Sequence, residues 1–136
     1  MVIDTNCIIS SLIKNGLSRW IIVSDALKFI TPEYTLTELS KHKTTICRKA
    51  HLNQEEFKLL LDLLFEYIEI ISIEEYNEFF NKAKTLIDDI DDVSFVALYL
   101  AKDADGIWSD DKHFKTQRTL KIYRTRDLSL VLHLKN

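Results

Sequence analysis

The chain has 136 residues, of which 46% are hydrophobic, and this length and composition suit one folded domain rather than a disordered chain. Its net charge of −3 lacks the basic excess that is typical of a simple nucleic-acid-binding module. No apolar run approaches the roughly 18 residues of a membrane span, and the two cysteines form no CxxC pair. We therefore expect a single domain over residues 1–136 of a soluble, cytoplasmic protein that does not enter a membrane.

Positive charge is nevertheless concentrated in two parts of the chain. The first part lies between residues 41 and 49, and the second consists of Lys112, Lys115, Arg118, Lys121, Arg124 and Arg126. Such clusters are more often solvated surfaces than binding sites, but they can also form a local phosphate-binding face. Nucleic acid therefore stays open as a partner.

The first third of the chain predicts a short strand followed by helices. Residues 1–4 are apolar and β-compatible up to an aspartate, and the chain then passes into an apolar segment at 5–13. Apolar side chains between 18 and 29 have partly helical spacing. Thr31-Pro32 is a helix-start signal, with threonine as the cap and proline in the first turn. The helix that it opens should run from 34 to about 43.

Two further helix starts combine a capping residue with a glutamate three positions later. Asn53 and Glu56 precede apolar residues at helical spacing. Ser72 and Glu75 repeat the arrangement before a helix that we expect to reach Ile87.

The last third alternates predicted helices and strands. A helix should follow Asp92, and residues 106–109 and 121–123 should form strands. Thr125 is expected to cap a final helix through Leu134, although leucine at every second position there also fits a strand.

Short apolar strands separated by helices predict a parallel sheet covered on both faces, and residues 68–71 supply one more strand. We therefore predict an α/β fold in which helices flank a central parallel sheet of four to five short strands, in a Rossmann-like, three-layer arrangement. Polar sites in such sheets gather beyond the carboxyl ends of the strands. Asp4 ends the first strand and Asp110-Asp111 follow a later one, so carboxylates should meet at one edge.

Four acidic positions fit such a site. Asp4 closes the first strand, Glu38 lies inside an early helix and Asp92 opens an apolar helix. Asp110 and Asp111 compete for the fourth position, and counting back from the following phenylalanine favours Asp111.

Each acid also has a plainer interpretation. Asp4 can cap the helix that follows it, and Glu38 can pair with Lys41 on the same helix. Asp92 and the aspartates before it can interact with a helix dipole. The four histidines show no HxxxH or Cys/His spacing, so the sequence does not predict a zinc site.

The order and spacing of the acids resemble the PIN-domain family, which includes VapC-type toxins and archaeal relatives. The likeness covers nearly the whole chain: an aspartate after the first strand, a glutamate in an early helix, an aspartate opening an apolar helix and a late Ser/Thr-x-Asp-x-x-Phe. It implies that Asp4, Glu38, Asp92 and Asp111 form the catalytic site, with Asp4, Asp92 and Asp111 binding metal. The first strand is shorter than is usual in the family, and His113 stands where many members carry another acid.

The resemblance also assigns supporting roles around the acids. Thr5 and Ser109 match the supporting hydroxyls of the family, Asn6 matches an adjacent polar residue, and Asp110 takes an outer or helix-capping position. Three lysines near the same edge are candidates for phosphate contacts: Lys41, Lys43 and Lys112.

Several carboxylates at one edge would repel one another without a cation, and Mg²⁺ and Mn²⁺ prefer such oxygen ligands. A bound ion can lower the pKa of water, orient it toward a phosphodiester and neutralise the developing charge. The expected cofactor is therefore Mg²⁺ or Mn²⁺.

The resemblance implies a metal-dependent endoribonuclease acting on RNA, most simply the toxin of a toxin–antitoxin pair. Such members usually form homodimers and are silenced by a small antitoxin protein that covers the acidic site. One alternative is a PIN-like module that binds RNA or a protein partner without cutting, which the net negative charge and His113 favour. Another is a phosphatase resembling haloacid dehalogenases that forms a phospho-aspartate on Asp4, but Asn6 occupies the place of the second aspartate which that family requires.

Overall fold

A five-stranded parallel sheet lies at the centre of the computed structural model, which describes residues 1–135. The strands are β1 (Val2–Ile3), β2 (Phe29–Pro32), β3 (Ile68–Ile71), β4 (Ile107–Trp108) and β5 (Ile122–Tyr123). Their spatial order is β3-β2-β1-β4-β5, and each neighbouring pair is parallel. The predicted α/β fold is confirmed, and the sheet has five strands where four to five were expected.

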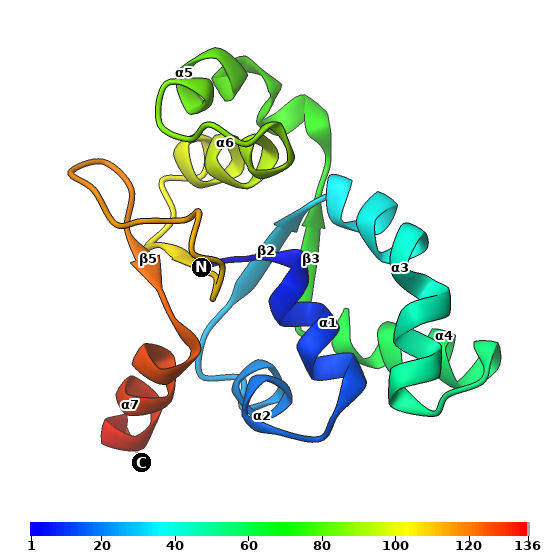
Figure 1. Cartoon of the computed structure of the whole chain (residues 1–136). Coiled ribbons are helices and arrows are strands. Elements are labelled where there is room, and N and C mark those ends of the chain that lie inside the picture. The colour runs from blue at the N-terminus through cyan, green and yellow to red at the C-terminus, as the bar shows by residue number, and fades with distance from the viewer. Residues whose placement is uncertain (136) are drawn as a thin grey trace.

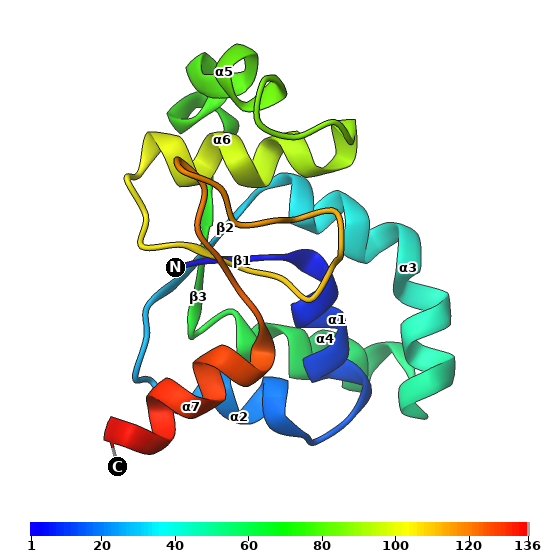
Figure 2. The same cartoon turned by 60° about the vertical axis from the view of Figure 1, so that its left-hand side comes forward.

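Helices cover both faces of this sheet. They are α1 (Thr5–Ile13), α2 (Leu17–Val23), α3 (Tyr34–Ala50), α4 (Gln54–Leu64), α5 (Phe80–Lys84), α6 (Val93–Ala101) and α7 (Thr125–Lys135). Figure 1 shows α5 and α6 on one side of the sheet and α1, α2, α4 and α7 on the other, and Figure 2 shows the same division after rotation. In the described part of the chain, none of the helices has the length and apolar character needed to cross a bilayer.

The pleat of the two central strands divides their side chains between two hydrophobic cores. Val2 and Ile107 belong to the core under α6, whereas Ile3 and Trp108 belong to the core with α1, α2 and α7. All four side chains are fully buried, as expected for a parallel sheet covered on both faces. These two short strands are therefore fixed from both sides, and so is the backbone that leaves them.

Two of the predicted helix starts are confirmed. The Asn53 side chain accepts a hydrogen bond from the Glu56 N–H at 2.8 Å, and the Glu56 carboxylate accepts one from the Asn53 N–H at 3.0 Å, which is a capping box. Helix α6 begins directly after Asp92.

The Thr31-Pro32 helix start is wrong, because both residues lie in β2. The Thr31 hydroxyl donates to the backbone carbonyl of Ile3 instead of capping a helix, and α3 begins at Tyr34. The helical segment before it is also shorter than expected, since α2 ends at Val23 and residue 29 already opens β2. Pro32 has no backbone N–H to donate, and the neighbouring Ile3 carbonyl of β1 accepts the Thr31 hydroxyl.

The expected helix from Ser72 to Ile87 is broken into short pieces. Its first part forms two 3-10 turns, 73–75 and 77–79, and only α5 is α-helical. The Ser72 hydroxyl donates to Glu74, and the Ile73 N–H donates to the Glu33 carboxylate. The segment is therefore held to the end of β2 rather than capped as one helix.

The final segment is a helix, but Thr125 is its first residue and not its cap. The Asp127 carboxylate accepts the backbone N–H of Arg124 at 2.8 Å, and the Thr125 hydroxyl is engaged elsewhere. The helical alternative is therefore correct for α7, and the strand alternative is not.

The strand order reverses between β1 and β4. From β1 the chain adds β2 and β3 on one side, and β4 and β5 follow on the other side. In open parallel sheets, ligands bind beyond the carboxyl ends of the strands at such a reversal. The residues that follow β1 and β4 thus occupy the position where a site is expected.

Candidate metal centre

Asp4 and Ser109 meet at this reversal point. Asp4 follows β1 directly and donates its backbone N–H to the Trp108 carbonyl at 3.0 Å, so the two strand ends are joined. The Ser109 hydroxyl donates to the Asp4 Oδ2 atom at 2.7 Å. Asp4 is only 5% exposed, and it is the N-cap residue of α1. Its side chain makes no capping hydrogen bond, and its carboxylate is held by Ser109, directly after β4.

Glu38 reaches the same edge from α3 and is held by threonine hydroxyls. The Thr5 hydroxyl donates to the Glu38 Oε1 atom at 2.6 Å and also lies 3.1 Å from the Thr35 hydroxyl. Thr35 lies 2.7 Å from the Thr31 hydroxyl, which in turn donates to the Ile3 carbonyl. Three buried hydroxyls therefore connect Glu38 to the backbone of β1.

Asp92 comes from the turn that precedes α6. It is 8% exposed, and its Oδ2 atom has no hydrogen-bond partner within the described residues. The turn itself is held at two points: the Asp89 Oδ1 atom accepts the Asp91 N–H, and the Tyr34 hydroxyl donates to Asp91. Asp92 is thus placed at the edge by its turn, while its own carboxylate oxygen stays unused.

Asp111 lies in the loop after β4, and Arg124 holds that loop in shape. One guanidinium nitrogen of Arg124 donates to the Ser109 and Asp111 carbonyls, both at 2.7 Å, and the other donates to the Phe114 carbonyl at 2.6 Å. The Asp111 N–H donates to the Ser109 hydroxyl at 3.1 Å. Arg124 therefore serves the architecture of the loop, although its sequence context suggested only a basic patch.

Asp110 points to α7 and not to the acidic edge. Its carboxylate accepts hydrogen bonds from both the backbone N–H and the hydroxyl of Thr125. The Trp108 indole N–H donates to the same hydroxyl at 3.0 Å. The predicted outer or helix-capping position of Asp110 agrees with this geometry, which leaves Asp111 as the acid that faces Asp4.

The close approach of the acids changes their protonation. Burial and the negative charges of Glu38 and Asp111 together raise the pKa of Asp4 to about 6, against the opposing hydrogen bond from Ser109. Burial, together with repulsion from Asp89, Asp4 and Asp111, raises the pKa of Asp92 to about 7. The four predicted acids therefore lie close enough together for their charges to raise the pKa values of Asp4 and Asp92.

Glu38 shows the same effect in weaker form. Burial raises its pKa, the hydrogen bond from Thr5 lowers it, and the nearby Asp91 raises it. His42 and Lys41 oppose this rise by their positive charge. Lys41 is thus close enough to act on the site, as its sequence position suggested.

Comparison with known protein families matches residues 2–133 to the PIN domain. The chain belongs to the PIN-domain family. No curated protein matches its sequence. Members of the family are generally nucleases, and the acids that the resemblance singled out are the ones that meet at the edge of this PIN domain.

The donor set of this PIN domain fits a divalent metal ion. Asp4, Asp92 and Asp111 offer carboxylate oxygens, which hard divalent ions prefer. The buried, unpartnered Oδ2 atom of Asp92 would otherwise carry an uncompensated desolvation cost. A cation would also offset the repulsion that raises the pKa values of Asp4 and Asp92.

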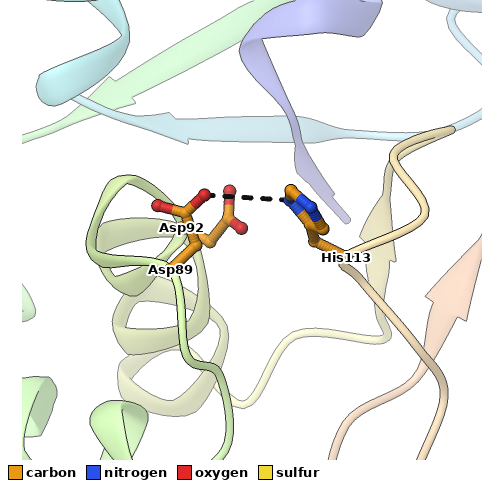
Figure 3. A group of neighbouring side chains, drawn as sticks. All are labelled: Asp89, Asp92 and His113. Atoms are coloured by element: carbon orange, nitrogen blue, oxygen red, sulfur yellow. Dashed lines mark ion pairs between the residues drawn. The ribbon is translucent and has the colours of Figure 1, made fainter.

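A second group of potential ligands lies beside these acids. One ligand atom from each of Asp89, Asp92 and His113 lies within 4.8 Å of the others. Figure 3 shows the two carboxylates on the turn before α6 and the imidazole on the facing loop, pointing toward one another. The His113 Nδ1 atom is 3.7 Å from Asp89 and 3.5 Å from Asp111.

A cavity of about 990 Å³ opens next to this group. Its lining includes Leu86, Ile87, Asp88, Asp89, Lys112, His113, Lys115, Gln117 and Arg124. The predicted phosphate contact Lys112 therefore lies on its wall, together with Lys115. The cavity therefore places Lys112 and Lys115 on the same lining as Asp89 and His113.

The other predicted supporting residues take less direct positions. Asn6 is exposed on α1, next to Thr5. The Lys43 ammonium lies 5.8 Å from the centre of the Phe57 ring, toward α4, so its observed partner is an aromatic face. Of the three lysines, Lys41 and Lys112 lie nearer the acidic edge.

Sequence reasoning missed three contributors to this PIN-domain site. Thr31 and Thr35 form the hydroxyl connection behind Glu38, and the spacing of four between them was the only sign in the sequence. Arg124 looked like one of the surface cations, because every residue has a backbone carbonyl and the sequence does not show which carbonyls it binds.

Proposed function

We propose that this PIN domain is a metal-dependent endoribonuclease that hydrolyses RNA phosphodiester bonds. The observation that carries the proposal is the meeting of Asp4, Glu38, Asp92 and Asp111 at the sheet reversal, with the unpartnered Asp92 oxygen among them. These acids come from four separate elements, so their meeting is a property of the fold and not of local sequence.

Asp4, Asp92 and Asp111 are the residues that would hold Mg²⁺ or Mn²⁺. When bound, such an ion lowers the pKa of water and neutralises the charge that develops on a phosphate. Ser109 fixes the Asp4 carboxylate, and the Arg124 contacts keep Asp111 opposite it. These contacts support the proposal, because ion binding and in-line attack both require ligands that are held in place.

Glu38 is the acid best placed to orient the attacking water. Its carboxylate is held by the Thr5 hydroxyl at 2.6 Å, and burial raises its pKa above that of a free glutamate, which makes it a better proton acceptor. Asp4, to which Ser109 donates, lies close enough for the charge of Glu38 to raise its pKa. Glu38 therefore acts beside the metal-binding acids rather than as one of them.

The basic wall of the cavity supports a nucleic-acid substrate. Lys112 and Lys115 line it together with Asp89, and Lys112 directly follows Asp111 in the chain, so an RNA backbone laid along this wall would bring a phosphate toward the acidic edge. Positive charge at this point offsets the net charge of −3 of the whole chain.

The test is cleavage of a pool of structured and single-stranded RNA with Mn²⁺, Mg²⁺ or EDTA. We expect metal-dependent cleavage that Asp4→Asn and Asp111→Asn both abolish, while exposed Asp62→Asn on α4 leaves it unchanged. Circular dichroism checks that each variant is folded. RNA that binds to folded protein but stays intact with either metal would favour the alternative of a binding module, and cleavage of single-stranded DNA alone would reassign the substrate.

The biological role that we propose is the toxin of a toxin–antitoxin pair, acting as a homodimer that a small antitoxin protein silences by covering the acidic edge. Family membership supports this role, since VapC-type toxins are PIN domains. Induced expression in a bacterial host should arrest growth, and Asp4→Asn should relieve the arrest. Light scattering of the purified protein should give the mass of a dimer. Normal growth during expression of active nuclease would contradict the toxin role.

A further inference from the structure

His113 departs from the acidic pattern of the family, and its position gives that departure a chemical meaning. Its imidazole faces Asp89 and Asp92 from the opposite loop, with one ligand atom of each residue within 4.8 Å of the others. The three residues come from two segments that are far apart in the sequence, which is why histidine spacing alone did not suggest a site.

An independent observation at Asp92 indicates that this group is built to take a ligand. Asp92 is 8% exposed, and its Oδ2 atom has no hydrogen-bond partner among residues 1–135. Buried carboxylate oxygens are normally satisfied, because an unpaired one is costly. In Figure 3 the Asp92 carboxylate lies beside that of Asp89 and faces the imidazole.

Asp89 and His113 are each fixed at one point and open at another. The Asp89 Oδ1 atom accepts the Asp91 N–H, which leaves Oδ2 directed at His113 at 3.7 Å. The His113 backbone N–H donates to Asp111 at 2.9 Å, so the backbone is held while the side chain stays accessible. Such positions allow small movements of the side chains to close around an ion.

We propose that Asp89, Asp92 and His113 bind a divalent transition-metal ion through one imidazole nitrogen and two carboxylates, beside the all-oxygen group of Asp4, Asp92 and Asp111. Imidazole suits transition-metal ions, and Mn²⁺ is the one among them that shares with Mg²⁺ a preference for carboxylates, so it fits a group with both ligand types. Mg²⁺ itself keeps to oxygen ligands. The inference rests on the proposed function, because Asp92 is common to both groups. It adds a nitrogen ligand, a second ion position and a preference for Mn²⁺ over Mg²⁺.

The test uses metal alone with untagged protein, so that RNA cleavage does not enter the readout. Pulsed electron paramagnetic resonance of the Mn²⁺-loaded protein should show ¹⁴N modulation from one imidazole. We expect His113→Gln to remove this modulation. The matched control is His51→Asn, at the exposed left-handed end of α3, where asparagine is well tolerated.

Calorimetric titration with MnCl₂ and MgCl₂ gives the second measurement. His113→Gln should weaken Mn²⁺ binding about tenfold or more, since even the loss of a partner behind a ligand has an effect of that size. Its Mg²⁺ affinity should stay within about twofold of the wild type. Asp89→Asn keeps the oxygen that caps the turn and should weaken Mn²⁺ binding in the same direction.

Two results would overturn the proposal: wild-type protein without ¹⁴N modulation, or modulation that persists in His113→Gln. In either case His113 serves only as an ion-pair partner of Asp89 and Asp111. These outcomes are independent of the nuclease test. Mg²⁺-supported cleavage without ¹⁴N modulation would retain the proposed function alone, and modulation without cleavage would retain the metal site alone.

Discussion

The two halves of the acidic site are held in place by different kinds of structure. Asp4 and Glu38 belong to a half supported by strands, in which each carboxylate accepts a hydrogen bond from a buried hydroxyl, of Ser109 and Thr5 respectively. Asp92 belongs to a half supported by turns, where its Oδ2 atom finds no partner within the described residues. In the first half each carboxylate already has a hydroxyl partner, whereas in the second half one buried carboxylate oxygen is left for a bound ion to satisfy.

This difference reflects where the chain is packed. Val2, Ile3 and Trp108 are fully buried, so the backbone that carries Asp4 and Ser109 is fixed by two cores. The facing turn and loop are instead held by side-chain hydrogen bonds, which Asp89 and Tyr34 make to the turn and Arg124 makes to the loop. The strand half therefore positions the reaction, and the turn half is suited to adapt to the ion.

The largest expected effect separates two adjacent acids in the loop after β4. Asp111→Asn should lower RNA cleavage at least about 100-fold, since it removes a proposed metal ligand, and Asp110→Asn should stay within about tenfold. The reason is that the Asp110 carboxylate binds Thr125 at the start of α7. Initial rates with Mn²⁺ measure both variants, and an equal loss in the two would contradict the assignment of Asp111 as the fourth acid.

The same loop shows how far the sequence alone could predict the site. Asp4 and Asp111 were predictable because short apolar strands precede both, and Asp92 because it opens an apolar helix. The parallel α/β sheet followed from the alternation of such strands with helices. These features depend on residues that are close together in the chain, so they can be recognised from one sequence.

The parts that could not be predicted depend on contacts between distant segments. Thr31-Pro32 has the pattern of a helix start, yet the Thr31 hydroxyl binds a strand carbonyl 28 positions away. Arg124 binds three backbone carbonyls, and carbonyls carry no residue identity. The region after Ser72 has helical spacing, but its tie to Glu33 breaks it into turns.

The next effect concerns the pH dependence of stability without metal. The pKa values of Asp4 and Asp92 are raised to about 6 and about 7, so the folded protein binds protons more tightly than the unfolded chain, where aspartates titrate near 4. The contribution to stability is therefore fully present below about pH 4 and is lost as pH rises through the folded-state pKa values. We expect the free energy of unfolding to fall between pH 4 and pH 8.

Asp92→Asn tests this expectation, because asparagine cannot ionise. The variant should equal the wild type near pH 4 and exceed it by about 2 kcal/mol at pH 8, in urea unfolding with EDTA. Saturating Mn²⁺ should reverse the order, since it stabilises the protein that binds it better. A wild type more stable than the variant at pH 8 in EDTA would contradict the proposed repulsion.

A smaller effect should follow from interrupting the hydroxyl connection behind Glu38. Thr35→Val keeps the shape of a fully buried side chain but removes its contacts with Thr5 and Thr31. The expected loss is about 1–2 kcal/mol of unfolding free energy from two lost hydrogen bonds, since the Thr5 and Thr31 hydroxyls keep their bonds to Glu38 and to the Ile3 carbonyl. Thr37→Val, exposed on the same helix, is the matched control and should change stability by less than about 0.5 kcal/mol. Equal values for the two variants would show that the connection contributes nothing to the strand half.

The smallest effect lies outside both halves, on the basic wall of the cavity. Lys115→Gln removes one charge that faces the proposed RNA path and should weaken RNA binding about two- to fivefold. It should also reduce the salt dependence of log Kd by about 0.7 if the lysine contacts one phosphate of a single strand. Fluorescence anisotropy across a range of salt concentrations, in an Asp4→Asn background that prevents cleavage, measures both quantities.

Lys58→Gln, exposed on α4, controls for net charge. The salt slope shows whether Lys115 contacts a phosphate directly. A lysine that acts only from a distance would change the affinity for RNA but not the number of phosphates that the protein neutralises. If both quantities match those of Lys58→Gln, the RNA does not follow the cavity, and the approach along α3 past Lys41 becomes the path to test.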